Sequence, residues 1–287
     1  MKDLCRLFYR TLGACAVLAV LLLLPGCSRS APSPPAPPVE EHAQTQPAAD
    51  ALRLGKECMK RGDSDGAIAH FGEAVQLDPK CAEAFCQRGN AYYDKMQLDR
   101  AIADYGEAIR LDPKCFEAYC NRGLSWREKK EFDKALADYT EAIRLDTSEA
   151  AVAYHARGNV YRAMRNFGKA IADFTEAVRR NEKFSEAYGD RGMVNADKGD
   201  LKQGIADQTR AIEIDPNSAQ WYVQRGGIYS QMHDAEKAIA DYNRAIEMDP
   251  RNAALYKLRG ETQQALGHAD DAAADFAKAR QLQGAAK

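Results

Sequence analysis

AEAFCQRGNAYYDKMQLDRAIADYGEAIRLDPKC, residues 82–115, is followed at once by FEAYCNRGLSWREKKEFDKALADYTEAIRLDTSE, residues 116–149. The second segment matches the first along its whole length, and five weaker copies surround the two. Aligned on a glycine, the copies recur at a constant interval, except that the step from Gly123 to Gly158 is longer by a single position. Self-similarity at such a fixed period indicates an array of structural repeats. The aligned glycines are Gly55, Gly89, Gly123, Gly158, Gly192, Gly226 and Gly260.

Each copy has the pattern of two helices joined by a turn. In the second half of the first quoted segment, Ile102, Tyr105 and Ile109 fall on one helical stripe. Asp112-Pro113 ends that helix, because the residue before a proline disfavours α geometry. The small glycine lets two antiparallel helices approach closely, and an aromatic residue fills the remaining space. One such pair cannot bury its own apolar face, so the copies must stack.

This pattern resembles the tetratricopeptide repeat across residues 48–286. The resemblance implies an all-α fold, a right-handed solenoid of about seven helix-turn-helix repeats. It also implies that the first helices of the repeats line a concave face, on which extended peptides or helices bind. The predicted repeats are residues 48–81, 82–115, 116–149, 151–184, 185–218, 219–252 and 253–286.

Six of the seven copies carry an arginine directly before the glycine and an aspartate directly before the aromatic position of the second helix. The first copy lacks both and has Leu54 and His70 instead. Their joint loss predicts a structural ion pair within each repeat, and copying by duplication is the alternative. Such a pair fixes geometry more than it adds stability. The predicted pairs are Arg88–Asp104, Arg122–Asp138, Arg157–Asp173, Arg191–Asp207, Arg225–Asp241 and Arg259–Asp275.

The fifth repeat departs from the pattern. Asn195 and Gln208 replace aromatic residues of the neighbouring repeats, and Gly204 replaces an alanine. Two interpretations stay open. The repeat has either decayed to a poorer core, or it forms a bend or weak joint between residues 48–149 and 151–286.

Residues 1–26 have the composition of a secretory signal. A short basic start precedes an apolar run over residues 11–24, and Leu-Pro-Gly-Cys follows, ending at Cys27. The run is shorter than the roughly 20 residues of a spanning helix, but it suits a signal-peptide core. The end of this segment resembles a bacterial lipobox, which implies cleavage before Cys27 and lipidation of Cys27. An ordinary signal peptide or an uncleaved anchor is the alternative.

The segment after the signal is rich in Pro, Ala and Ser and shows no apolar period. Such a composition predicts a disordered, extended tether. The expected domains are thus the signal peptide at 1–26, the lipidated cysteine and linker at 27–47, and the repeat domain at 48–286. On the lipoprotein resemblance, Ser28 favours the outer membrane. We therefore expect a lipid-anchored protein on the periplasmic side of the cell envelope.

The resemblance also locates a candidate binding surface. Projection of the first helices predicts hydrogen-bonding groups and positive charge in repeats one to four. Small residues such as Gly189 and Gly227 predict close backbone approach in repeats five and six. The residue set that related domains use for chaperone tails is not reproduced, so such a tail is not expected. The predicted peptide-binding residues are Lys56, Asn90, Tyr93, Asn121, Arg127, His155, Asn159 and Arg162.

Four cysteines recur with the period of the repeat. Cys81 and Cys86 return one repeat later as Cys115 and Cys120. Three interpretations stay open: duplicated packing residues, a disulfide such as Cys86–Cys115 in an oxidising compartment, and a site of four thiolates. The spacing is not that of a zinc knuckle, so no metal is expected.

The sequence carries no pattern that predicts catalysis. GxSxG, P-loop, HExxH and CxxCH motifs are missing, and a formal net charge of -2 with mixed signs offers no patch for nucleic acid. We expect no enzyme and no cofactor, but an adaptor for protein or peptide partners in the bacterial envelope. A stoichiometric subunit of a secretion or pilus-assembly machine is the alternative, and a hydrolase or sensor using the paired cysteines is a third. The last repeat has no extra capping helix, so a homodimer is one way to cover that end.

Overall fold

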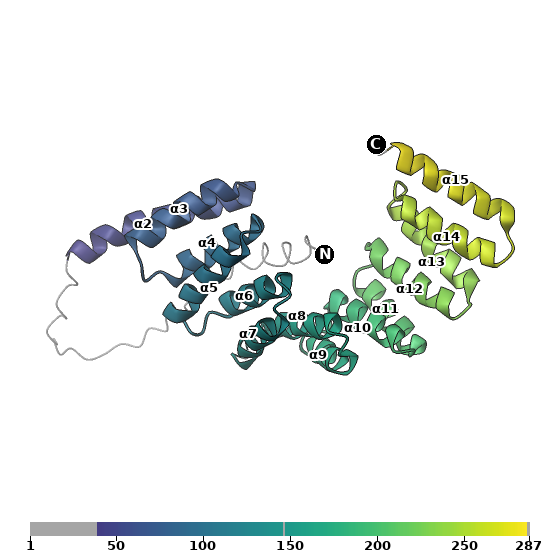
Figure 1. Cartoon of the computed structure of the whole chain (residues 1–287), viewed down its shortest axis with the longest axis horizontal. Coiled ribbons are helices and arrows are strands. Elements are labelled where there is room, and N and C mark those ends of the chain that lie inside the picture. The colour runs from purple at the N-terminus through teal and green to yellow at the C-terminus, as the bar shows by residue number, and fades with distance from the viewer. Residues whose placement is uncertain (1–38, 146, 286–287) are drawn as a thin grey trace, which may run out of the picture. The chain divides into compact units, whose positions relative to one another are not determined.

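A computed structural model describes residues 39–145 and 147–285 of the chain. The predicted signal peptide, Cys27 and most of the predicted linker lie outside these residues. The described part consists of fourteen helices joined by short turns (Figure 1). The helices are α2 (Val39–Arg61), α3 (Ser64–Leu77), α4 (Ala82–Asp94), α5 (Leu98–Leu111), α6 (Phe116–Glu128), α7 (Phe132–Arg144), α8 (Ala150–Ala163), α9 (Phe167–Arg180), α10 (Ser185–Asp197), α11 (Leu201–Ile214), α12 (Ala219–Gln231), α13 (Ala235–Met248), α14 (Ala253–Ala265) and α15 (Ala269–Ala285).

The helices form seven pairs, with an even-numbered first helix and an odd-numbered second helix in each. From α3 onward every helix packs against the next one in the chain, and α4, α6, α8, α10 and α12 also contact one another in sequence. The predicted all-α array of about seven helix pairs is confirmed.

The aligned glycine is a contact point for the aromatic ring of the same repeat. A Cβ at Gly89 would lie 2.7 Å from Cε1 of Tyr105, and one at Gly158 would lie 2.7 Å from Cε1 of Phe174. Both rings are fully buried. A side chain at the glycine would therefore push the two helices of the pair apart, which is the physical basis of the sequence pattern.

The predicted linker ends earlier than position 47. Helix α2 begins at Val39 and contains Pro47 in its interior. The expectation of an extended tether is thus wrong for residues 39–47. Proline removes one helical hydrogen bond and normally favours a break, but Glu, Ala and Gln residues around it are strong helix formers.

Each predicted Arg–Asp pair has two parallel hydrogen bonds within one repeat. Arg88 donates from Nε and Nη2 to Asp104 at 2.7 and 2.8 Å. The aspartates are buried, and the arginines are about one-fifth exposed. The same geometry recurs in the pairs Arg122–Asp138, Arg157–Asp173, Arg191–Asp207, Arg225–Asp241 and Arg259–Asp275.

In the later repeats the same arginine also reaches the preceding repeat. Nη1 of Arg157 donates to Oγ1 of Thr140 at 3.1 Å, and Nη1 of Arg191 donates to Oγ1 of Thr175 at 3.2 Å. The arginine therefore joins repeats as well as the two helices of one repeat. Equivalent bonds run from Arg225 to Thr209 and from Arg259 to Asn243.

The fifth repeat has a different core from its neighbours. The fully buried Gln208 donates from Nε2 to the carbonyl of Gly189 at 2.8 Å and to Oε1 of Gln224 at 2.9 Å. A Cβ at Gly204 would lie 3.0 Å from the carbonyl oxygen of Gly192, so α10 and α11 approach closely. Amide hydrogen bonds and backbone contact thus replace the ring seen in the other repeats.

Candidate functional site

Most predicted binding residues lie where one first helix meets the next. We use the term first-helix face for the surface formed by side chains that connect consecutive even-numbered helices. Lys56 on α2 contacts Glu83 on α4 through Nζ and Oε1 at 2.6 Å. Two larger polar clusters follow, one between α4 and α6 and the other between α8 and α10.

The first cluster is centred on Asn90. Its Oδ1 accepts hydrogen bonds from the hydroxyl of Tyr105 at 2.9 Å and from Nδ2 of Asn121 at 2.8 Å. Its Nδ2 donates to Oε1 of Glu117 at 3.0 Å. Asn90 is therefore held between two repeats by groups from its own repeat and from the next.

Burial is the main influence on the pKa of Glu117 in this cluster. It raises the pKa of Glu117 above its ordinary value, and the hydrogen bond from Asn90 opposes that rise. The neighbouring Glu83 raises the pKa of Glu117 further. The carboxylate is thus in an acidic environment, and a partner that brings positive charge to it would relieve this repulsion.

The second cluster is centred on Asp190 of α10. His155 Nε2 lies 2.8 Å from Asp190 Oδ2, and Arg162 Nη1 donates to Asp190 Oδ1 at 2.7 Å. Burial alone would raise the pKa of Asp190, but hydrogen bonds from His155 and Asn159 and the charge of Arg162 outweigh it and lower the pKa. A carboxylate accepts only, so the His155 nitrogen that faces it must carry a proton.

One acceptor in the second cluster is unused. Nδ2 of Asn159 lies 3.1 Å from Nε2 of His155, while its buried Oδ1 makes no hydrogen bond. The ring of His155 is also held between Phe174 and Phe184, with ring centroids 5.6 and 4.9 Å away. The imidazole of His155 is therefore packed between two rings and beside the Asn159 amide.

Three of the basic residues predicted for this face are paired with carboxylates. Lys56 pairs with Glu83, Arg162 pairs with Asp190, and Arg127 pairs with its neighbour Glu128 at 2.9 Å. The positive charge expected in repeats one to four is therefore partly offset by acidic partners. The main reason is that acidic side chains reach across from the next repeat, which a projection of isolated helices does not include.

Three residues of the candidate site were not predicted from the sequence: Glu83, Glu117 and Asp190. A signal was present, because Lys56–Glu83 and Asn90–Glu117 share a separation of 27 positions, and Arg162–Asp190 has one of 28. This separation is a little shorter than the repeat. Each such pair therefore joins one repeat to the next, and the positions of the two partners within their repeats hardly change from pair to pair.

Two other predicted binding residues lie partly inside the array. Asn121 is 7% exposed and serves to hold Asn90. Tyr93 is partly buried and packs against the core around Cys86 and Tyr105. These side chains support the surface more than they form it.

The two glycines predicted to allow close backbone approach in repeats five and six have different surroundings. Gly189 is covered by Trp221, whose Cζ3 would lie 2.3 Å from a Cβ at that position. Gly227 has no atom within 4 Å of the equivalent point. Close backbone approach is thus available at Gly227 and blocked at Gly189.

Two hollows accompany these surfaces. One is lined by Arg162, Arg165, Phe167 and Asp197 and adjoins the second cluster through Arg162. The guanidinium of Arg165 lies over the ring of Phe167, 5.7 Å from its centroid. This hollow combines two cations, a ring and a carboxylate, which is the chemistry needed to hold a peptide side chain or carboxylate.

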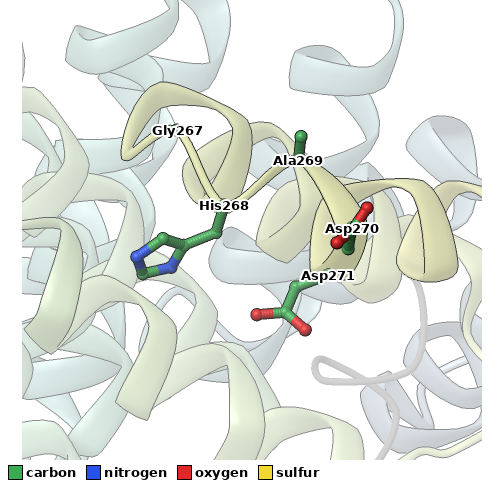
Figure 2. Close-up of a pocket in the computed structure, with 5 residues that line it drawn as sticks. All are labelled: Gly267, His268, Ala269, Asp270 and Asp271. Carbon is green, nitrogen blue, oxygen red and sulfur yellow. The ribbon is translucent and has the colours of Figure 1, made fainter.

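The other hollow lies at the turn between α14 and α15 (Figure 2). It is formed by Gly267, His268, Ala269, Asp270 and Asp271, which are all exposed. The turn and the first residues of α15 supply every lining residue, and all five are exposed. We therefore place the candidate site at the first-helix face.

The described cysteines form no disulfide. Cys86 is buried in the core beside Tyr105, and Cys115 packs against the same cluster. In the part of the chain that the structure describes, no three His, Cys, Asp or Glu side chains group as metal ligands. Nor does any helix there have the length and apolarity to cross a membrane.

Comparison with family models identifies the repeats. A model described as TPR repeat matches residues 55–95 and 89–126. One tetratricopeptide repeat model matches residues 116–148 and 219–252, and a second matches residues 155–219. The matches together extend from residue 55 to residue 252 with one short gap. A comparison with curated proteins finds no match.

Solved structures have the same fold. A tetratricopeptide repeat protein from Parabacteroides merdae is 24% identical, with 83% of this chain and 93% of that chain covered and a TM-score of 0.63. YrrB, described as a TPR protein with an unusual peptide-binding site, is 26% identical over 63% of this chain and 92% of its own, with a TM-score of 0.50. PilF of Pseudomonas aeruginosa is 16% identical over 72% and 94%, with a TM-score of 0.64. The chain therefore belongs to the tetratricopeptide repeat family, whose domains bind protein or peptide partners.

Proposed function

We propose that this protein is an adaptor that binds an extended protein segment on its first-helix face while a lipid on Cys27 holds it in a bacterial envelope. The observation that carries the binding part is the hollow beside Arg162. It lies next to the packed cluster of His155, Asn159 and Asp190, so the guanidinium of Arg162 is held in place before a partner arrives. A site that needs no rearrangement loses less entropy on binding.

The chemistry of this hollow favours a peptide with an acidic or carboxy-terminal group. Arg162 uses Nη1 for Asp190, and Arg165 is exposed at the rim. Both guanidinium groups suit carboxylates, and the ring of Phe167 offers apolar contact for a neighbouring side chain. YrrB supports a peptide as the ligand, since that relative carries a peptide-binding site.

Capture of partners from detergent-solubilised envelopes tests the binding surface. Arg165→Gln removes one charge of the hollow and keeps much of the length of the side chain. Loss of one charge-assisted hydrogen bond of about 1.5–3 kcal/mol corresponds to roughly a tenfold or greater drop in affinity. Lys202→Gln, on the exposed surface of α11, is the matched control and should leave capture unchanged. Equal capture by the wild type and by Arg165→Gln would contradict the proposed surface.

The envelope part of the proposal rests on the signal-like residues 1–26 and on Cys27. A multiply acylated cysteine binds a membrane firmly, because each buried methylene contributes about 0.8 kcal/mol. Metabolic labelling with a palmitate analogue should mark the wild type and sediment it with membranes. Cys27→Ser should lose both properties, and a labelled, membrane-bound Cys27→Ser protein would refute lipidation at this residue.

The two parts can fail separately. A soluble Cys27→Ser protein that still captures the same partners would separate anchoring from binding. Partners recovered at a fixed ratio in one large complex would favour the alternative of a structural subunit in a secretion or pilus-assembly machine. Catalysis has no part in the proposal.

A further inference from the structure

Asp197 is an acidic residue of the hollow beside Arg162 and has no cation to pair with. It is the last residue of α10 and is exposed. In the part of the chain that the structure describes, its side chain takes part in no hydrogen bond or ion pair. A carboxylate at the carboxyl end of a helix faces the negative end of the helix dipole, which disfavours it. Neither a partner nor the helix therefore stabilises the charge of Asp197.

The equivalent acid two repeats earlier does have a partner. In repeat three, Glu128 ends α6 and accepts a hydrogen bond from Nη2 of the adjacent Arg127 at 2.9 Å. Repeat four retains the arginine as Arg162 but has Ala163 in place of the acid. Repeat five has the reverse arrangement, in which an alanine precedes Asp197. The cation and the anion that are neighbours in repeat three are thus divided between repeats four and five.

The two divided charges line one hollow, together with Arg165 and Phe167. Arg162 does not pair with Asp197 there, because its Nη1 donates to Asp190 at 2.7 Å. The guanidinium of Arg165 lies over the ring of Phe167, 5.7 Å from its centroid. Two guanidinium groups and a carboxylate without a partner therefore face the same space, and Asp197 is paired with neither of them.

We propose that Asp197 determines the specificity of this hollow by binding a cationic side chain that lies next to a carboxylate of the partner. The inference rests on the proposed adaptor function and names the class of segment that the adaptor binds. The partner carboxylate contacts Arg162 and Arg165, and the ammonium or guanidinium group beside it contacts Asp197. Phe167 offers apolar surface to the methylene stem of that cationic side chain.

Two kinds of segment have this chemistry. One is an internal segment in which an acidic residue adjoins a lysine or arginine. The other is a chain that ends in lysine or arginine, where the carboxylate and the cation belong to the same residue. A purely acidic segment satisfies the two guanidinium groups but is repelled by Asp197, and a purely basic segment has the opposite mismatch. The hollow therefore selects a dipolar segment over a simply acidic one.

Fluorescence anisotropy of labelled octapeptides with the full chain measures this specificity. One peptide has a central Glu-Lys pair and blocked ends, and a second ends in lysine with a free carboxylate. Each has a control in which norleucine, which keeps the methylene stem, replaces the lysine. We expect at least one lysine peptide to bind roughly three- to tenfold more tightly than its control, because it gains a charge-assisted contact. The peptide that shows this preference identifies the kind of segment.

Substitution of Asp197 assigns the preference to this residue. Asp197→Asn keeps the shape of the side chain, and it should abolish the lysine preference without weakening the norleucine peptides. Asp197→Lys should reverse the preference and favour a peptide with a central Glu-Glu pair. Asp133→Asn removes an exposed carboxylate from α7 and is the matched control, in which the lysine preference should persist. A lysine preference that survives in Asp197→Asn would overturn the proposal, as would equal affinities or no saturable binding in the wild type.

Failure of this inference can be told apart from failure of the adaptor function. If Arg165→Gln weakens the lysine and norleucine peptides alike and Asp197→Asn weakens neither, the hollow binds carboxylates and Asp197 takes no part in specificity. If none of the peptides binds, the inference fails, but loss of partner capture by Arg165→Gln still supports the adaptor surface. Unchanged capture by Arg165→Gln contradicts the adaptor surface itself.

Discussion

The joints of the first three repeats are fixed differently from the joints of the last four. Between repeats one and two and between two and three, Lys95 and Lys129 form ion pairs with Asp65 and Asp99 of the preceding repeat. At the joints between repeats three and seven, the arginine of the Arg–Asp pair donates instead to a threonine or asparagine of the preceding repeat.

One position accounts for the arginine bond of the later joints. Glycine occupies it as Gly72 and Gly106 in the first two repeats, and Thr140 is the first residue there with a side-chain acceptor. The ammonium–carboxylate pairs lie on the surface, where water and salt weaken them. The arginine itself lies partly inside the array. One repeat pattern thus supports joints of unequal strength, because positions outside the pattern vary freely.

We expect the largest loss of stability from a substitution at Asp207, which lies in the last four repeats. Asp207 accepts bonds from Arg191, Asn195 and Gln203 and is 2% exposed. Asp207→Ala leaves the buried side of Arg191 without its counter-charge, so we expect a loss of about 3–5 kcal/mol. Thermal unfolding and hydrogen exchange of α10 and α11 measure it. Glu213→Ala, on the exposed surface of α11, should change stability by less than about 0.5 kcal/mol. If the Asp207→Ala protein is as stable as the Glu213→Ala protein, the buried ion pair does not stabilise the array.

The next effect concerns the close contact between repeats five and six. Gly189→Ala places a methyl group 2.3 Å from Trp221, and such overpacking costs about 1–3 kcal/mol. Gly227→Ala is the matched change in open space on the next first helix, and it should stabilise by about 0.5–1 kcal/mol. Differential scanning calorimetry compares the two. A rise in midpoint for both variants would show that Trp221 moves aside at little cost.

A transplant between the two regions addresses the joints directly. Gly106→Thr adds an acceptor beside Nη1 of Arg122, which lies 3.7 Å from the point where a Cβ would stand. The hydrogen bond and the loss of a helical glycine should together stabilise the protein by about 1–2 kcal/mol. Gly106→Ala isolates the helical contribution from the hydrogen bond. If the alanine variant gains as much as the threonine variant, the joint bond of the later repeats contributes little.

The weakest effect should appear at the surface pair of repeats two and three. Lys129→Gln should destabilise by less than about 1 kcal/mol, because Asp99 is largely exposed. The difference from the wild type should shrink further in about 1 M NaCl, where the Debye length is about 3 Å. Urea titrations at low and high salt compare the two proteins. A salt-independent loss would mean that the stem of Lys129 acts by packing on Trp126, whose ring centroid lies 5.8 Å from Nζ.

The array of helix pairs could be derived from the amino-acid sequence alone. The glycine, the aromatic residue and the Arg–Asp positions recur at one period, and each has a local reason: a close helix contact, a ring to fill it, or a counter-charge in the same repeat. These contacts lie within one repeat and do not depend on how neighbouring repeats are placed. The Arg–Asp pairs could therefore be identified from their spacing. The start of α2 could not, because a proline in a favourable helical context has no single outcome.

Contacts between repeats required the folded arrangement. Asp190 reaches back to His155 and Arg162, and Trp221 covers Gly189. These contacts depend on how far one repeat is displaced against the next. That displacement is set by the packing of whole helices, and no single residue pattern encodes it. The charge and the chemistry of the first-helix face follow from it.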